Sequence, residues 1–314
     1  MPSSTSLIAR ARNLPAPLQG AFLMTVAALL FAVMNAGIKL AAEEGLHPFQ
    51  IAFFRNAFAL MFMLPWLARM GFGALRTDRL KVHLWRAGIG LVAMLCWFTA
   101  IVVMPMADAV ALNFTVPLFA TAGAAIFLGE IVRARRWTAT IVGFLGVLII
   151  LRPGFVEITP VMTLPVIAAC FMAVTVLIVK SLSRTEEPMA VVLYMNLLLT
   201  PLSLIPALFV WQMPSLRALL FMVFVGACAV LAHIAFTRAF AKADASAILP
   251  FDYARLPFVA AIGFLLFGEQ PDLWTWVGAA VIAASAVYIA NREARIAKER
   301  PTHRPGSEAV KVKT

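Results

Sequence analysis

The chain has 314 residues, of which 62% are hydrophobic and only 13% are charged. This composition lies far outside the range of soluble globular domains and excludes a chain built mainly from them. The formal net charge of +11 would suit a nucleic-acid-binding protein. However, seven basic residues gather in the C-terminal segment and most of the others lie in short predicted loops. This distribution indicates membrane topology and excludes nucleic acid as a partner.

Uncharged or nearly uncharged stretches recur along the chain after a predicted cytoplasmic N-terminal segment, residues 1–17. Each stretch is close to the roughly 20 apolar residues that a helix needs to cross a bilayer. They predict ten membrane spans at 18–41, 48–69, 82–104, 106–129, 137–151, 161–181, 189–211, 217–240, 245–268 and 272–291. Residues 292–314 are predicted to form a basic, disordered cytoplasmic tail.

The distribution of lysine and arginine predicts the orientation of these spans. With ten spans, the loops and termini on one side carry twenty-one of these residues, whereas the other side carries only Lys39, Arg152 and Arg217. Cytoplasmic loops carry the excess of basic residues in membrane proteins. Both termini are therefore expected in the cytoplasm.

The two halves of the chain resemble each other in sequence. Five features recur at separations of 139 to 141 residues: Lys39 and Lys180, Pro48 and Pro188, Pro65 and Pro206, Gly129-Glu130 and Gly268-Glu269, and Trp137 and Trp276. Because an odd number of spans reverses the direction of the second copy, we predict two inverted five-helix repeats, 18–154 and 155–291. Such halves can open a central site to each face in turn, which predicts a secondary transporter that works by alternating access.

Two segments share a small-residue start, an internal proline and a Gly-Glu end: 107–130, ADAVALNFTVPLFATAGAAIFLGE, and 243–269, ADASAILPFDYARLPFVAAIGFLLFGE. In these segments the chain resembles the EamA-type family of the drug/metabolite transporter superfamily. The resemblance implies a ten-helix carrier in which the first four helices of each half surround a central cavity. It places Glu130 and Glu269 in the family signature, where a structural or gating role is expected. It also implies efflux of amino acids or related metabolites, with uptake of a cofactor-like compound such as riboflavin or S-adenosylmethionine as the alternative.

Three ionisable residues, Arg55, Asp252 and Arg255, fall well inside predicted spans. A charge at the centre of a membrane helix costs roughly 2.5 to 3.5 kcal/mol on insertion scales, so something must compensate it. A wet cavity with a bound substrate would do so, and an ion pair between Asp252 and Arg255 is the structural alternative. Arg55 has the further alternative of extending to the membrane interface. All three are predicted to bind substrate, and Asp252 is the candidate proton carrier.

Further polar residues inside the apolar spans are candidates for the same cavity. Asn35, Asn113 and His233 can either hydrogen-bond another helix or face the substrate, and Tyr253 can stack on an aromatic substrate. Prolines inside spans free backbone carbonyls that protein or cavity water must satisfy. We therefore predict a structural or gating role for Pro117, Pro250 and Pro257.

The sequence contains no G-x-x-x-x-G-K-[ST] loop for ATP, no H-E-x-x-H zinc motif and no G-x-S-x-G elbow. No catalytic residue, metal or cofactor is predicted. An intramembrane enzyme or a channel remains the alternative from another class; the enzyme would depend on Asp252, His233 and the arginines, and a channel on rings of like charge. The predicted location is a bacterial inner membrane, with the lipid bilayer and a small-molecule substrate as partners. A homodimer is compatible with the sequence.

Overall fold

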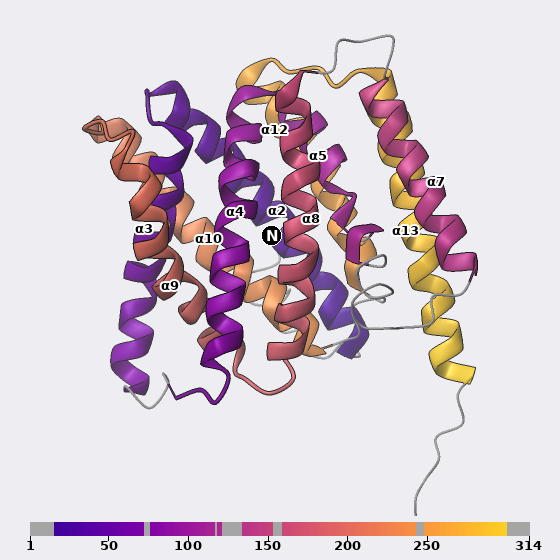
Figure 1. The fold of residues 1–314 in the computed structure, drawn as a ribbon, viewed down its shortest axis with the longest axis horizontal. Helices are drawn as coiled ribbons and strands as arrows, with labels where there is room; N and C mark the ends of the chain where they lie inside the picture. The colour runs from indigo at the N-terminus through magenta and orange to yellow at the C-terminus, as the bar shows by residue number, and fades with distance from the viewer. Residues whose placement is uncertain are drawn as a thin grey trace, which may run out of the picture.

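A computed structural model describes residues 16–71, 76–116, 118–120, 134–152, 159–242 and 248–299 of the chain. Within these residues the chain is helical with short connections and contains no strand, in agreement with the all-α prediction. Figure 1 labels most of the elements, which are α2 (Ala16–Glu43), α3 (Pro48–Met70), α4 (Leu80–Val103), α5 (Met106–Asn113), α7 (Ala134–Leu151), α8 (Pro160–Leu182), α9 (Pro188–Leu208), α10 (Leu216–Lys242), η2 (Leu249–Ala254), α12 (Arg255–Phe267) and α13 (Leu273–Glu299). Pro117 and Glu130, both predicted to have a structural or gating role, lie outside the described residues.

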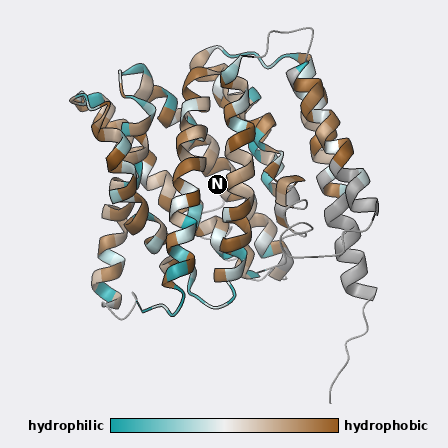
Figure 2. Ribbon diagram, in the orientation of Figure 1, coloured by the Kyte–Doolittle hydropathy of each residue, from teal (hydrophilic) through white to brown (hydrophobic). Residues whose placement is uncertain are grey.

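Six of these helices, α2, α3, α4, α8, α9 and α10, are long and apolar enough to cross a membrane by their length and composition. Two others, α7 and α13, contain shorter apolar stretches, Ile141–Ile150 and Leu273–Ser285. Figure 2 shows hydrophobic residues along the lengths of the helices and hydrophilic residues toward the two ends of the bundle. Long apolar helices with polar ends are the pattern that a bilayer requires.

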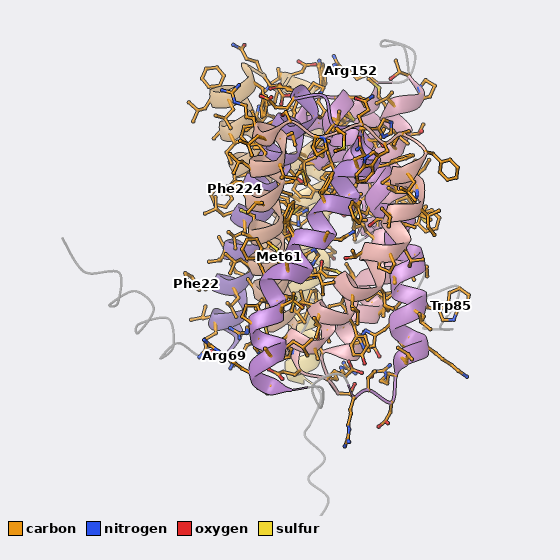
Figure 3. All side chains as sticks on the ribbon, turned by 90° about the vertical axis from the view of Figure 1, so that its left-hand side faces the viewer. Phe22, Met61, Arg69, Trp85, Arg152 and Phe224 are labelled. Atoms are coloured by element: carbon orange, nitrogen blue, oxygen red, sulfur yellow. The ribbon has the colours of Figure 1, made fainter. Side chains whose placement is uncertain are left out.

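The outer surface of the bundle is apolar as well. Phe22, Met61, Trp85 and Phe224 are exposed large hydrophobic residues, and Figure 3 shows them on the outside of the bundle between the end that carries Arg152 and the end that carries Arg69. Trp85 is the most exposed of the four, at 71%. In water such an apolar surface would promote aggregation, whereas in a lipid bilayer it is the expected exterior.

The closest helix contacts join distant parts of the sequence. α2 packs extensively along α10 and α4 along α8, while α3 packs on α9, α5 on α12 and α7 on α13. Figure 1 shows α7 and α13 side by side at one edge of the bundle, away from α3 and α9 at the other. Each helix named from the first half of the chain, α2 to α7, therefore packs against a helix from the second half, α8 to α13.

Glycines permit the closest of these approaches. A Cβ atom added to Gly146 on α7 would lie 2.8 Å from the carbonyl oxygen of Gly278 on α13, and one added to Gly278 would lie 2.6 Å from the carbonyl oxygen of Gly146. Small residues let membrane helices approach through their backbones, which strengthens dispersion contacts where no hydrophobic driving force acts. The α7–α13 contact is therefore specified by two glycines.

The segment predicted as the ninth span is not one continuous α-helix. Residues Leu249–Ala254 form the 3-10 helix η2, which leads directly into α12 at Arg255. Pro250 lies at the start of η2 and Pro257 in the first turn of α12, positions where a missing backbone N–H costs little. η2 packs against α2, which brings Asp252 and Tyr253 to the centre of the bundle.

The C-terminal helix is longer than the sequence predicted. α13 continues past Asn291 to Glu299, so residues 292–299 are helical and the prediction of disorder for this part of the tail is wrong. The reason is local, because the stretch NREARIAKE consists largely of Arg, Glu, Ala and Lys, which are strong helix formers, and contains neither glycine nor proline. The change from apolar to charged residues after Asn291 therefore does not mark the end of the helix.

Candidate functional site

A cavity of about 210 Å³ lies at the centre of the bundle, between residues of α2, α3, α4, α5, α8, α9, α10, η2 and α12. Its wall contains all seven residues predicted to face a cavity: Asn35, Arg55, Asn113, His233, Asp252, Tyr253 and Arg255. These residues come from six different helices, and only the tertiary fold brings them together. Concave sites with a few converging polar groups are the usual places for small-molecule binding.

Aromatic side chains form much of the cavity wall. The rings of Phe114 and Tyr253 meet edge to face with centroids 4.7 Å apart, and the rings of Phe31 and His233 do so at 5.1 Å. The guanidinium carbon of Arg255 lies 4.9 Å from the centroid of the Phe31 ring. Such a wall offers large apolar faces on which a flat ligand can stack.

Asp252 and Arg255 pair with each other across the junction of η2 and α12. Nη2 of Arg255 lies 2.5 Å from Oδ1 of Asp252, with the i, i+3 spacing considered as a structural alternative from the sequence. Both residues still line the cavity. The ion pair accounts for the burial of these two charges without requiring a ligand.

Arg55 is buried, with 3% of its surface exposed, so it does not extend to the interface. Its Nη1 donates a hydrogen bond to Oδ1 of Asn56 at 2.6 Å, and Nδ2 of Asn56 donates in turn to Oγ of Ser203 at 3.2 Å. Nε of Arg55 has no hydrogen-bond partner among the described residues. Neutral groups therefore hold this guanidinium in the wall of the cavity.

Arg86 is a charged cavity residue that sequence reasoning missed. The charge distribution places Arg86 among the twenty-one basic residues on the cytoplasmic side, but it is 6% exposed, lies in α4 and lines the cavity. Its Nη1 donates to the carbonyl oxygen of Val191 at 2.9 Å, and its Nη2 contacts Sδ of Met195 at 3.3 Å. Its position inside the predicted span 82–104 was the available signal.

The charges of the cavity do not cancel. Among the described lining residues, three arginines and one aspartate give a formal charge of +2 with His233 counted as neutral. Arg55 and Arg86 are close enough to repel each other, and neither forms a salt bridge within the described part of the chain. The cavity is thus electropositive on the side of α3 and α4.

Several buried polar atoms in this wall have no partner among the described residues. Nδ2 and Oδ1 of Asn35, the hydroxyl of Tyr253 and Nε of Arg255 are all in this state. Asn113 differs, because its Nδ2 contacts the carbonyl oxygen of Pro165 and Sδ of Met172, both at 3.4 Å. Unpaired buried polar atoms are rare in folded proteins and are costly unless water or a ligand pairs with them.

Glu269 joins three parts of the fold beyond one end of this cavity. It forms an ion pair with Lys39 of α2, and its Oε2 accepts a hydrogen bond of 2.9 Å from the backbone N–H of Met106 at the start of α5. Nζ of Lys39 also donates to the carbonyl oxygen of Met104 at 3.3 Å. Gly268, with a φ of 65°, ends α12 in a left-handed turn that precedes Glu269. One basic side chain and one backbone amide therefore hold this carboxylate.

Comparison with known proteins decides the family. The EamA-like transporter family matches the chain twice, at residues 18–152 and 159–291. The chain belongs to this family. The resemblance stated from the sequence is therefore confirmed, and this EamA-like protein is a multi-pass transporter of the bacterial inner membrane rather than an enzyme.

Three relatives of this EamA-like chain indicate the range of its similarity. It is 38% identical to a riboflavin transporter of Vibrio cholerae over 283 residues, which cover 89% of this chain and 95% of the relative. It is 31% identical to an S-adenosylmethionine uptake transporter of Rickettsia bellii over 244 residues, covering 78% and 84%. It is 30% identical to a pseudopaline exporter of Pseudomonas aeruginosa over 274 residues, covering 85% and 94%.

A solved structure has the same fold as this EamA-like chain. It aligns with a TM-score of 0.64 and 17% sequence identity, over 89% of this chain and 99% of the other. The similarity covers the bundle as a whole. The likeness concerns the fold alone.

Proposed function

We propose that this protein is a secondary transporter of flavins, with riboflavin as the substrate to test first. The observation that carries the proposal is the 38% identity with a riboflavin transporter across 89% of the chain. The cavity supports it, because aromatic rings and unpaired buried polar atoms suit a flat ring system with hydrogen-bonding edges. We therefore favour riboflavin, which the family resemblance implied as an alternative, over the amino acids that it implied first.

The charge of the cavity favours riboflavin over S-adenosylmethionine, the second candidate. At neutral pH S-adenosylmethionine carries a sulfonium and an ammonium cation against one carboxylate, and the formal charge of +2 on the lining residues would disfavour its net charge of about +1. Riboflavin is neutral and presents carbonyl and hydroxyl oxygens that arginine can bind as a donor. Family membership does not choose between riboflavin and S-adenosylmethionine, but the charge of the cavity favours riboflavin.

We further propose that transport occurs by alternating access between two inverted repeats, 18–154 and 155–291, with ten spans and both termini in the cytoplasm. The helix packing supports this proposal. Exchanging the two halves converts the α2–α10 contact into the α8–α4 contact, and it leaves the α3–α9, α5–α12 and α7–α13 contacts unchanged. The two matches to the family agree with the same division of the chain.

In this mechanism the substrate site is the central cavity, and the contact of Lys39 with Glu269 closes the outer end. Lys39 lies on the side of the protein that has few basic residues, which the charge distribution assigns to the outside. Opening this end would break the ion pair and release the backbone N–H of Met106. Asp252 remains the candidate proton carrier, since protonating it would break its pair with Arg255 and free that guanidinium for the cavity.

Counterflow in proteoliposomes tests the proposed function. Vesicles preloaded with unlabelled riboflavin should accumulate labelled riboflavin transiently and with saturation, and vesicles preloaded with S-adenosylmethionine or amino acids should not. Protein-free vesicles and vesicles with Arg55→Met provide the controls. Saturable exchange of S-adenosylmethionine or an amino acid, without exchange of riboflavin, would contradict the proposed substrate. Flux that does not saturate would indicate a channel.

A further inference from the structure

Asn35 differs from Asn113, the other asparagine in the cavity wall, in its lack of partners. It lies in α2, is 1% exposed and lines the cavity, yet neither its amide nitrogen nor its amide oxygen has a hydrogen-bond partner among the described residues. The amide nitrogen of Asn113, the other asparagine in the wall, contacts a backbone carbonyl and a methionine sulfur. Asn35 therefore offers a complete, unused carboxamide to the cavity.

The corresponding place in the second half of the chain shows that helix packing does not require an amide there. Lys39 and Lys180 are separated by 141 residues, and the same separation takes Asn35 to Val176. Val176 lies on α8 and lines the same cavity. An apolar residue is thus accommodated on one side of the cavity, and an unpaired amide is present on the other, which points to a polar ligand group on the side of α2.

A carboxamide presents a hydrogen-bond donor beside an acceptor in one plane. Its best partner presents an acceptor beside a donor, as asparagine finds at the edge of adenine in DNA. A cyclic imide, with its ring N–H between two carbonyl groups, has this pattern on either side of the nitrogen. The isoalloxazine ring of flavins carries such an imide.

We propose that Asn35 determines substrate specificity by binding the cyclic imide edge of the ring through a pair of hydrogen bonds. Its amide oxygen accepts from the imide N–H, and its amide nitrogen donates to an adjacent carbonyl oxygen. The aromatic wall formed by residues such as Phe31 and Phe114 then contacts the apolar part of the ring. This inference rests on the proposed function for the identity of the ring and extends it to the group that is recognised.

A cycle of one ligand change and one residue change tests the pairing. Binding of riboflavin and of riboflavin methylated at the imide nitrogen is measured by flavin fluorescence on the purified protein, for wild type and for Asn35→Leu. Wild type should bind riboflavin at least about tenfold more tightly than the methylated compound, since an unpaired buried polar group is penalised strongly. Asn35→Leu should bind riboflavin about tenfold more weakly than wild type does, and should bind the two ligands within about twofold of each other.

Three outcomes would overturn or separate the claims. Equal binding of the two flavins by wild type overturns the inference without any variant. Discrimination that persists in Asn35→Leu assigns the effect of the methyl group to crowding and also overturns it. If wild type binds neither flavin, the proposed function fails; uridine and 3-methyluridine then provide the same imide comparison, and equal or absent binding of both overturns the inference as well.

Discussion

Two sides of the central cavity carry arginines in different states. On the side of η2 and α12, Arg255 forms an ion pair with Asp252. On the side of α3 and α4, the partners of Arg55 and Arg86 among the described residues are an asparagine, a backbone carbonyl and a methionine sulfur. A buried ion pair largely compensates its own charges, whereas a buried guanidinium without a carboxylate does not. The difference indicates that the charges on the side of α3 and α4 need a ligand or cavity water to compensate them, whereas the charges on the side of η2 and α12 compensate each other.

The strongest test of this comparison removes an unpaired charge. Arg55→Met should lower riboflavin counterflow about 100-fold, equivalent to roughly 3 kcal/mol of binding or transition-state stabilisation. Its unfolding temperature in detergent should not fall, because an apolar side chain of similar length replaces a charge that lacks a buried counter-ion. Arg217→Met, at a side chain that is 77% exposed, should leave both transport and stability unchanged. A loss of stability in Arg55→Met that matches its loss of transport would contradict the distinction between the two sides.

Breaking the ion pair between Asp252 and Arg255 should affect stability more than transport. Asp252→Asn leaves Arg255 without its carboxylate and should lower the free energy of unfolding by about 2 kcal/mol, less than the roughly 3–5 kcal/mol of a fully buried pair. Riboflavin exchange should fall by about tenfold or less. If Asp252 carries the coupling proton, accumulation driven by a pH gradient should disappear while exchange persists. The same response to a pH gradient in both proteins would remove Asp252 from that role.

The smallest expected effect concerns the ion pair between Lys39 and Glu269, which lies outside the cavity wall. Glu269→Gln and Lys39→Met should each change the exchange rate by about threefold, since a partly buried pair contributes little more than about 1 kcal/mol. The double variant should behave like either single variant, because both changes break one contact. Additive effects would show that the two residues act separately, and the proposed closure of the outer end would then need another contact.

Much of the fold could be predicted from the sequence because the bilayer imposes a simple rule on helix length and polarity. The helices α2, α3 and α8 begin and end within two residues of their predicted spans. The C-terminal end of α13 could not be predicted in this way, since its last turns leave the apolar stretch and depend on helix propensity. Pro250 and Pro257 indicate an irregular helix in the sequence, but the prolines alone do not specify the 3-10 geometry of η2.

The candidate site was only partly visible in the sequence. Arg55, Asp252 and Asn35 could be singled out because a polar group in an apolar span needs an explanation. Arg86 lies near the start of its predicted span, so its signal in the sequence was weak, and its partner, the carbonyl oxygen of Val191, is supplied by the packing of α4 against α9. The absence of partners around Asn35 is likewise a property of the assembled helices.

The two glycines between α7 and α13 constrain how the molecule can move. Each carbonyl oxygen occupies the space that a side chain would fill on the opposite helix, so sliding one helix along the other would require both backbones to separate first. In the proposed alternating-access mechanism we therefore expect this line of contact to stay in place as the axis of rotation. Helices farther from the axis would travel farther for the same rotation, so a small tilt about α7 and α13 would become a large displacement at α3 and α9 on the opposite edge.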